Sequence, residues 1–210
     1  RIEAVYGQTC IRKSKESVLC AHYGSEYGEF VQLDPVQSAM KIPVLMYHKV
    51  GADVNSKEDT FLNVSTSNFQ KQLKALKFLG YTGITFADAV LGLEGKLKLP
   101  RKPVCITFDD GYVNVLENAA PALKQLRWPA TVFIPTDYVG DVNRWDFANG
   151  KPTLPIMNWD QLRALQAEGW EIAGHTVTHP HLEQLNDNEA REEMLGGKLA
   201  IENELGNQER

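Results

Sequence analysis

At residues 104–112 the chain reads Val-Cys-Ile-Thr-Phe-Asp-Asp-Gly-Tyr. The first five residues are mostly β-branched or aromatic and predict a buried strand. Gly111 then allows a sharp turn, and in β/α proteins the residues just past a strand face the active-site mouth. Neighbouring strand side chains point to opposite sides, so we expect Asp109 and Asp110 to do different jobs, one holding a metal and the other moving a proton. Taken alone, most Asp-Asp-Gly triplets are solvated turns.

Strands and helices are predicted to alternate on both sides of this stretch. The expected strands are 42–48, 84–86, 104–108, 130–134 and 170–173. The expected helices are 67–80, 87–93, 113–126, 158–169 and 186–205. Ser67 is expected to cap the first helix, and Pro121 to kink the third. Such alternation predicts an α/β fold with a parallel sheet or barrel. Residues 136–157 are expected to form a long loop, which in a compact domain is often functional.

Residues 1–40 show no sustained periodicity and are interpreted as an appended, loop-rich segment, or as an arm packed on the main domain at 41–210. Cys10 and Cys20 lie in this segment and could pair if the protein is exported. His22 is expected at the surface. Cys105 lies inside the predicted strand and is expected to be a small core residue.

Composition narrows the possible partners. The chain has 210 residues and a formal net charge of -5, which argues against a nucleic-acid or anionic-membrane partner. No apolar run approaches the length of a membrane span. The sequence starts at Arg1 without an initiator Met or signal peptide, so localisation can be argued only indirectly.

A second polar motif, His175-Thr176-Val177-Thr178-His179, follows the last predicted strand. Its β-branched residues and the following Pro180 disfavour a helix, so the two histidines are expected on a loop at the same rim as Asp109 and Asp110. Two imidazoles and one carboxylate make a three-ligand site for zinc or a similar divalent ion, with a position left open for water. The alternative is a polar turn with hydrogen-bonded imidazoles.

Together, Thr107–Gly111 and His175–His179 resemble the first two signature motifs of the polysaccharide deacetylases (NodB-homology domain, carbohydrate esterase family 4). The resemblance covers roughly residues 41–205. It implies an irregular (β/α) barrel and metal-dependent hydrolysis of N-acetyl groups on a sugar polymer. It also implies that Asp109 is the general base and that Asp110, His175 and His179 bind the metal, with Zn²⁺ as first choice and Co²⁺, Ni²⁺ or Mn²⁺ as alternatives.

The residues Pro43–Val50 resemble the start of the subgroup that deacetylates poly-β-1,6-N-acetylglucosamine, in which the motifs are circularly permuted. There a histidine on the first strand is the general acid, and His48 is the matching position. The alternative is a core-edge histidine hydrogen-bonded to backbone. A further motif of the Arg-x-x-x-Tyr-Pro-x-Gly kind is expected after the second motif, and the chain stops at Arg210 about where it would begin, so the barrel is expected to be incomplete at the C-terminus.

The resemblance therefore implies a hydrolase acting on linear amides, with a polysaccharide substrate of the biofilm or cell envelope and an extracytoplasmic location. Trp145 and Tyr112 are candidates for stacking on sugar rings, with ordinary partly buried aromatics as the alternative. Two other functions stay open. One is a polysaccharide O-acetyl esterase that uses the same metal chemistry, and the other is a non-catalytic glycan-binding domain.

Overall fold

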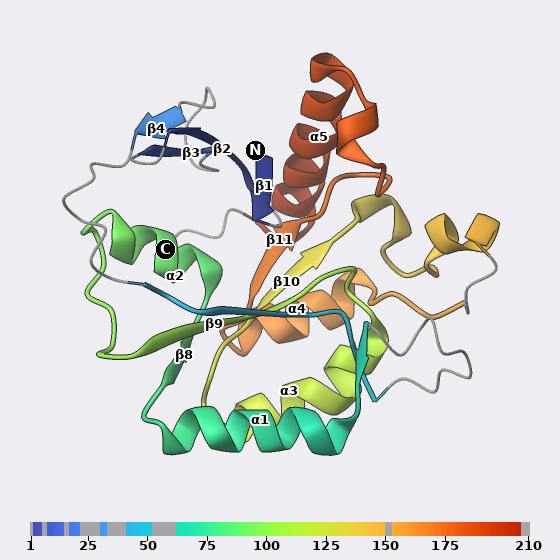
Figure 1. Ribbon diagram of the computed structural model, residues 1–210. Coiled ribbons are helices and arrows are strands. Elements are labelled where there is room, and N and C mark those ends of the chain that lie inside the picture. The colour runs from blue at the N-terminus through green and yellow to red at the C-terminus, as the bar shows by residue number, and fades with distance from the viewer. Residues whose placement is uncertain are drawn as a thin grey trace.

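The computed structural model describes residues 41–51, 62–149 and 153–206, together with four backbone strands within the first 40 residues. The main body is a parallel sheet surrounded by helices (Figure 1). Its strands are β5 (Val44–Tyr47), β8 (Thr82–Ile84), β9 (Pro103–Phe108), β10 (Thr131–Ile134) and β11 (Glu171–Gly174). The predicted α/β class with a parallel sheet is confirmed.

The strand order is β11-β10-β9-β5, and β8 also pairs with β9. Among the described strands no pairing joins β5 to β11, so the barrel is not closed within this part of the chain. Two short strands, β6 (Lys49–Val50) and β7 (Asn63–Val64), form a separate parallel pair. Because all strands of the main sheet run in parallel, their carboxyl ends meet at one edge, where the predicted site residues lie.

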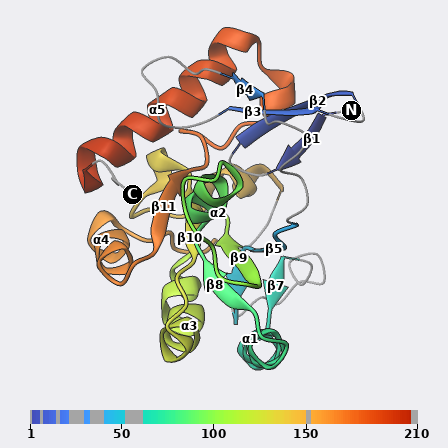
Figure 2. The same ribbon diagram turned by 90° about the vertical axis from the view of Figure 1, so that its left-hand side faces the viewer.

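The helices are α1 (Thr66–Phe78), α2 (Phe86–Leu93), α3 (Ala120–Leu126), α4 (Trp159–Ala167) and α5 (Asp187–Leu205). Figure 2 shows α1, α3 and α4 following one another around the outside of the sheet. The predicted caps Asn158 and Asn186 are confirmed as capping boxes. The prediction of Ser67 as the first cap was wrong, because the extended Ser65 accepts the Asn68 N–H and the helix starts earlier.

The expected kink before Pro121 takes the form of a π-helical turn, η2 (Val115–Ala119), that runs directly into α3. Proline has no N–H to give to the regular helix ladder, which favours such an irregularity. The long loop contains two short 3-10 turns, η3 (Thr136–Tyr138) and η4 (Arg144–Asn149), and a third, η5 (Leu182–Gln184), precedes α5.

Successive side chains of β9 point to opposite faces of the sheet and belong to two separate hydrophobic clusters. Val104, Ile106 and Phe108 face the main core, which α1, α3, α4 and α5 share with the sheet, while Cys105 faces a smaller cluster with Ile84 and Ala89 of β8 and α2. Cys105 is fully buried, and burial raises the pKa of its thiol to about 12. The prediction of Cys105 as a core residue is confirmed.

The described parts of the first 40 residues are strands, which the sequence pattern did not predict. They are β1 (Ile2–Val5), β2 (Gln8–Ser14), β3 (Ser17–Ala21) and β4 (Phe30–Gln32), paired antiparallel in sequence order. Short hairpin strands depend on their partners more than on local periodicity, which is why the pattern missed them. Cys10 and Cys20 are register partners across β2 and β3, but their side chains, like His22, lie outside the described residues. The division at residue 40 stays a prediction.

In the described residues no helix combines the length and apolar character that crossing a membrane requires.

Candidate active site

The two carboxylates leave β9 in different directions. Asp109 continues the strand pairing, and its N–H donates to the carbonyl of Tyr47 at 2.9 Å. Asp110 then turns into the left-handed region with φ 71°, and Gly111 follows with φ 69°. A Cβ on Gly111 would lie 2.6 Å from Cδ1 of Ile134, so this position needs glycine for space as well as for conformation. The backbone therefore changes conformation between the two carboxylates: Asp109 still pairs as part of the strand and Asp110 does not.

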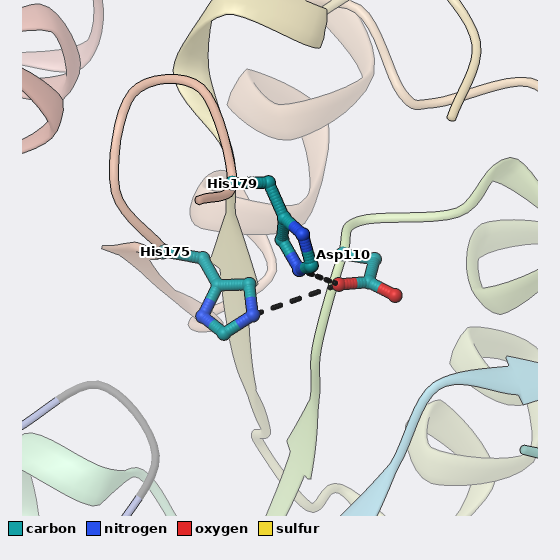
Figure 3. Close-up of side chains that lie close together, drawn as sticks. All are labelled: Asp110, His175 and His179. Carbon is teal, nitrogen blue, oxygen red and sulfur yellow. Dashed lines mark ion pairs between the residues drawn. The ribbon is translucent and has the colours of Figure 1, made fainter. Parts of the chain in front are cut away.

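The two histidines come from the loop after β11. The N–H of His175 donates to the carbonyl of Ile134 at 2.9 Å and extends the pairing with β10, and the chain then bends away without forming a helix, as predicted. Oδ1 of Asp110 lies 3.6 Å from Nε2 of His175 and 3.2 Å from Nε2 of His179 (Figure 3). One ligand atom from each of the three residues lies within 4.8 Å of the others. The structure therefore brings together the three residues predicted to bind a metal.

Burial and charge at this cluster suit a divalent cation. Burial raises the pKa of Asp110, but His179, His48 and His175 outweigh it and hold this pKa below its ordinary value. Burial lowers the pKa of His175 to about 4, so its imidazole is neutral at pH 7, as a metal ligand must be. Oδ1 of Asp110 is buried and accepts no hydrogen bond from a described residue. Two imidazoles and a buried carboxylate oxygen fit Zn²⁺ or a similar ion.

His48 and Asp109 lie together beside this cluster. His48 follows β5, and its Nε2 is 3.9 Å from Oδ2 of Asp109. Asp109 is fully buried, neither carboxylate oxygen accepts a hydrogen bond from a described residue, and burial followed by the charge of Asp110 raises its pKa well above 3.8. Burial lowers the pKa of His48. The two residues predicted to move protons are therefore neighbours with oppositely shifted pKa values, a pattern typical of acid–base pairs.

The aromatic residues near the site differ from the prediction. Trp145 stacks on His179, with ring centroids 4.5 Å apart and planes at 24°, and Tyr138 meets Trp145 edge-on at 4.9 Å. Trp145 thus covers a predicted metal ligand. Tyr112 is 1% exposed and packs inside the main core, so of its two possible roles the alternative, an ordinary buried aromatic, holds. An aromatic residue that follows an Asp-Asp-Gly turn can fold back into the core, and the sequence pattern alone does not show this.

Two buried polar residues hold the loop that carries Trp145. Asn143 donates from Nδ2 to Asp146 at 3.0 Å and accepts the N–H of Leu154 at 2.6 Å. The roles of Asn143 and Tyr138 could not be predicted, because a single Asn or Tyr in a loop carries no distinctive sequence pattern.

A family model described as polysaccharide deacetylase matches residues 96–210, more than half of the chain. The chain belongs to this family. The poly-β-1,6-N-acetyl-D-glucosamine N-deacetylase of Staphylococcus aureus is 33% identical over 157 residues, which cover 74% of this chain and 50% of the relative. The chain spans about half the length of the curated relatives it matches.

Two solved structures share the fold of this polysaccharide deacetylase family member. The Streptococcus pyogenes deacetylase PplD, solved in complex with acetate, has a TM-score of 0.63 and 28% identity, over 79% of this chain and 70% of PplD. IcaB from Ammonifex degensii has a TM-score of 0.65 and 26% identity, over 80% of this chain and 71% of IcaB. The resemblance to NodB-type deacetylases is thereby confirmed.

Proposed function

We propose that this protein is a metal-dependent hydrolase that removes N-acetyl groups from an N-acetylglucosamine-containing polysaccharide and releases acetate. The observation that carries the proposal is the adjacency of two groups of side chains. Asp110, His175 and His179 form a three-ligand cluster, and beside it lie His48 and Asp109 with their pKa values shifted in opposite directions. Family membership and the name of the Staphylococcus aureus relative support the choice of substrate.

Asp110, His175 and His179 would hold the metal, which when bound acts as a Lewis acid on the acetyl carbonyl and on a water molecule. Asp109 is proposed as the general base that takes a proton from the attacking water. Burial and the charge of Asp110 raise its pKa, which makes the carboxylate a stronger base than an ordinary aspartate.

His48 is proposed as the general acid that gives a proton to the leaving amine, which otherwise departs as an unstable anion. Because burial lowers the pKa of His48, its imidazole starts neutral at pH 7 and needs a proton during the reaction. Oδ2 of Asp109 lies 3.9 Å from Nε2 of His48, close enough for the proton taken from water to be passed on after a small movement. One proton would thus travel from water through Asp109 and His48 to the amine.

The proposal is tested by acetate release from a β-1,6-linked N-acetylglucosamine oligomer, with acetylated xylan oligosaccharides as the competing substrate. We expect acetate from the first substrate and none from the Asp109→Asn variant on either. Acetate from xylan alone would support the O-acetyl esterase. Metal binding without acetate from any substrate would support a glycan-binding domain. Because such polymers lie outside the cytoplasm, an extracytoplasmic location is part of the proposal, and cell fractionation tests it.

A further inference from the structure

The loop that carries the two histidines contains two residues in unfavourable backbone conformations. Thr176 has φ 69° and His179 has φ 57°, both in the left-handed region that residues other than glycine rarely adopt. Thr176 is also β-branched, for which this region is especially unfavourable. Such conformations persist only where the surroundings hold them. One supporting hydrogen bond lies within the loop, where Oγ1 of Thr176 accepts the N–H of His179 at 3.1 Å, and contacts from outside the loop add to it.

Glu193 on α5 supplies three hydrogen bonds to this loop. Its Oε2 accepts the N–H of Val177 at 2.7 Å and the N–H of Thr178 at 2.9 Å, and its Oε1 accepts the Thr178 hydroxyl at 2.7 Å. Hydrogen bonds to a carboxylate are stronger than those between neutral groups. All three contacts fall between the two histidines, so Glu193 fixes the segment that sets their separation.

Two glycines let α5 come close enough for these contacts. A Cβ on Gly197 would lie 2.9 Å from the carbonyl oxygen of Thr176, and one on Gly196 would lie 2.8 Å from Cγ2 of Val177. Glycine disfavours a helix interior, yet Gly196 and Gly197 both lie within α5. Here they remove the side chains that would push the loop away, so one face of α5 acts as a platform beneath the loop.

We propose that Glu193 is a positioning residue that holds His175 and His179 in the geometry that binds the metal, with Gly197 providing the close approach. The inference rests on the metal site of the proposed function. Partners outside the ligand set commonly change metal affinity by about 10–100-fold when removed. Glu193 acts through the backbone of the loop between the two ligands rather than through their ring nitrogens.

The test compares Glu193→Ala and Glu193→Gln with Glu192→Ala, a matched control that removes an exposed glutamate from the next position of the same helix. Zn²⁺ affinity is measured by competition with a chromogenic chelator, and the visible absorption spectrum of the Co²⁺-loaded protein reports ligand geometry. We expect Glu193→Ala to weaken Zn²⁺ binding by about 10–100-fold and to change the Co²⁺ spectrum. Glu193→Gln should be intermediate, because its amide oxygen can still accept an N–H. Glu192→Ala should match the wild type.

Two further variants keep the proposal testable if Glu193→Ala does not fold, as judged by circular dichroism. Thr178→Val removes one of the three hydrogen bonds and keeps the β-branched shape, and we expect a smaller loss of affinity. Gly197→Ala should improve helix propensity yet weaken Zn²⁺ binding, because its Cβ meets the loop backbone. Wild-type protein that binds no Zn²⁺ would overturn the metal site itself. If the wild type binds Zn²⁺ and the folded variants have the same Zn²⁺ affinity and the same Co²⁺ spectrum as the wild type, the positioning role of Glu193 is wrong while the metal site stands.

Discussion

Replacing Asp109 by asparagine should stabilise the metal-free protein while abolishing its activity. The carboxylate is fully buried, neither of its oxygens accepts a hydrogen bond from a described residue, and burial together with the charge of Asp110 raises its pKa well above 3.8. An ionised side chain in this place costs free energy of folding. Asparagine has nearly the same shape and carries no charge, so it removes this cost together with the proposed base.

The magnitude follows from proton linkage. Between pH 3.8 and the raised pKa of Asp109 in the folded state, the folded protein keeps a proton that the unfolded chain has released. The contribution of Asp109 to stability is therefore fully present below pH 3.8 and is lost as pH rises through the folded-state pKa. A difference of one proton changes the free energy of unfolding by about 1.4 kcal/mol per pH unit. The free energy of unfolding of Asp109→Asn relative to the wild type should therefore increase with pH at this slope above pH 3.8, and level off above the folded-state pKa of Asp109.

The assay is urea unfolding of metal-stripped wild type and variant at intervals from pH 4 to 8. Asp110→Asn is the matched control, because the surrounding histidines lower the pKa of Asp110 and its ionised form is favoured in the folded state. Its contribution is present above pH 3.8 and is lost as pH falls through its lowered pKa, so Asp110→Asn should be no more stable than the wild type. A stability difference for Asp109→Asn that is unfavourable, or that does not change with pH, would refute the reasoning.

Three further outcomes are expected. Gly111→Ala should lower the free energy of unfolding by about 2–5 kcal/mol in urea, because it combines a positive φ with a new Cβ only 2.6 Å from Ile134. Gly169→Ala has φ 90° but its Cβ would meet no atom within 4 Å beyond its chain neighbours, so it should cost only about 1–2 kcal/mol. Equal costs would contradict the packing argument. His48→Ala should lower kcat on an N-acetylglucosamine oligomer by about 10²–10⁴-fold while the metal content stays intact. The loss of kcat should be smaller on an aryl acetate, because its leaving group needs little protonation. Equal losses on both substrates would indicate that His48 has only a structural role. Trp145→Ala should weaken Zn²⁺ binding by about 2–12-fold, which corresponds to about 0.5–1.5 kcal/mol of ring stacking on His179. Phe147→Ala, which removes an exposed aromatic of the same loop, should leave Zn²⁺ binding unchanged. Equal effects of the two variants would show that the loop, and not the stacked ring, matters for Zn²⁺ binding.

The features that local chemistry determines could be predicted from the sequence. The buried strand before Asp109, the capping boxes at Asn158 and Asn186 and the non-helical loop between the histidines all depend on a few neighbouring residues. Parallel strands that end at one edge of a sheet then explain why distant motifs meet. The meeting of His175 and His179 with Asp110 was expected for this reason.

The features that depend on tertiary contacts could not be predicted. Gly196 and Gly197 lie in a helix, where glycine is disfavoured, and the reason for them is the loop that packs against them. For Tyr112 the sequence left open a role in sugar stacking or an ordinary buried aromatic, and core packing decides for the buried aromatic. Burial, which no local pattern measures, also decides the direction in which the pKa values of His48 and Asp109 shift.

The most direct test of metal-dependent deacetylation is a Zn²⁺ titration of the metal-stripped protein, followed by acetate release from a β-1,6-linked N-acetylglucosamine oligomer. We predict that activity rises in proportion to added Zn²⁺ and levels off at about one equivalent per chain, as expected for a single three-ligand catalytic site. The Asp110→Asn variant should stay inactive over the same range. Full activity in the stripped protein, or no acetate release with one equivalent of Zn²⁺ bound, would contradict the account.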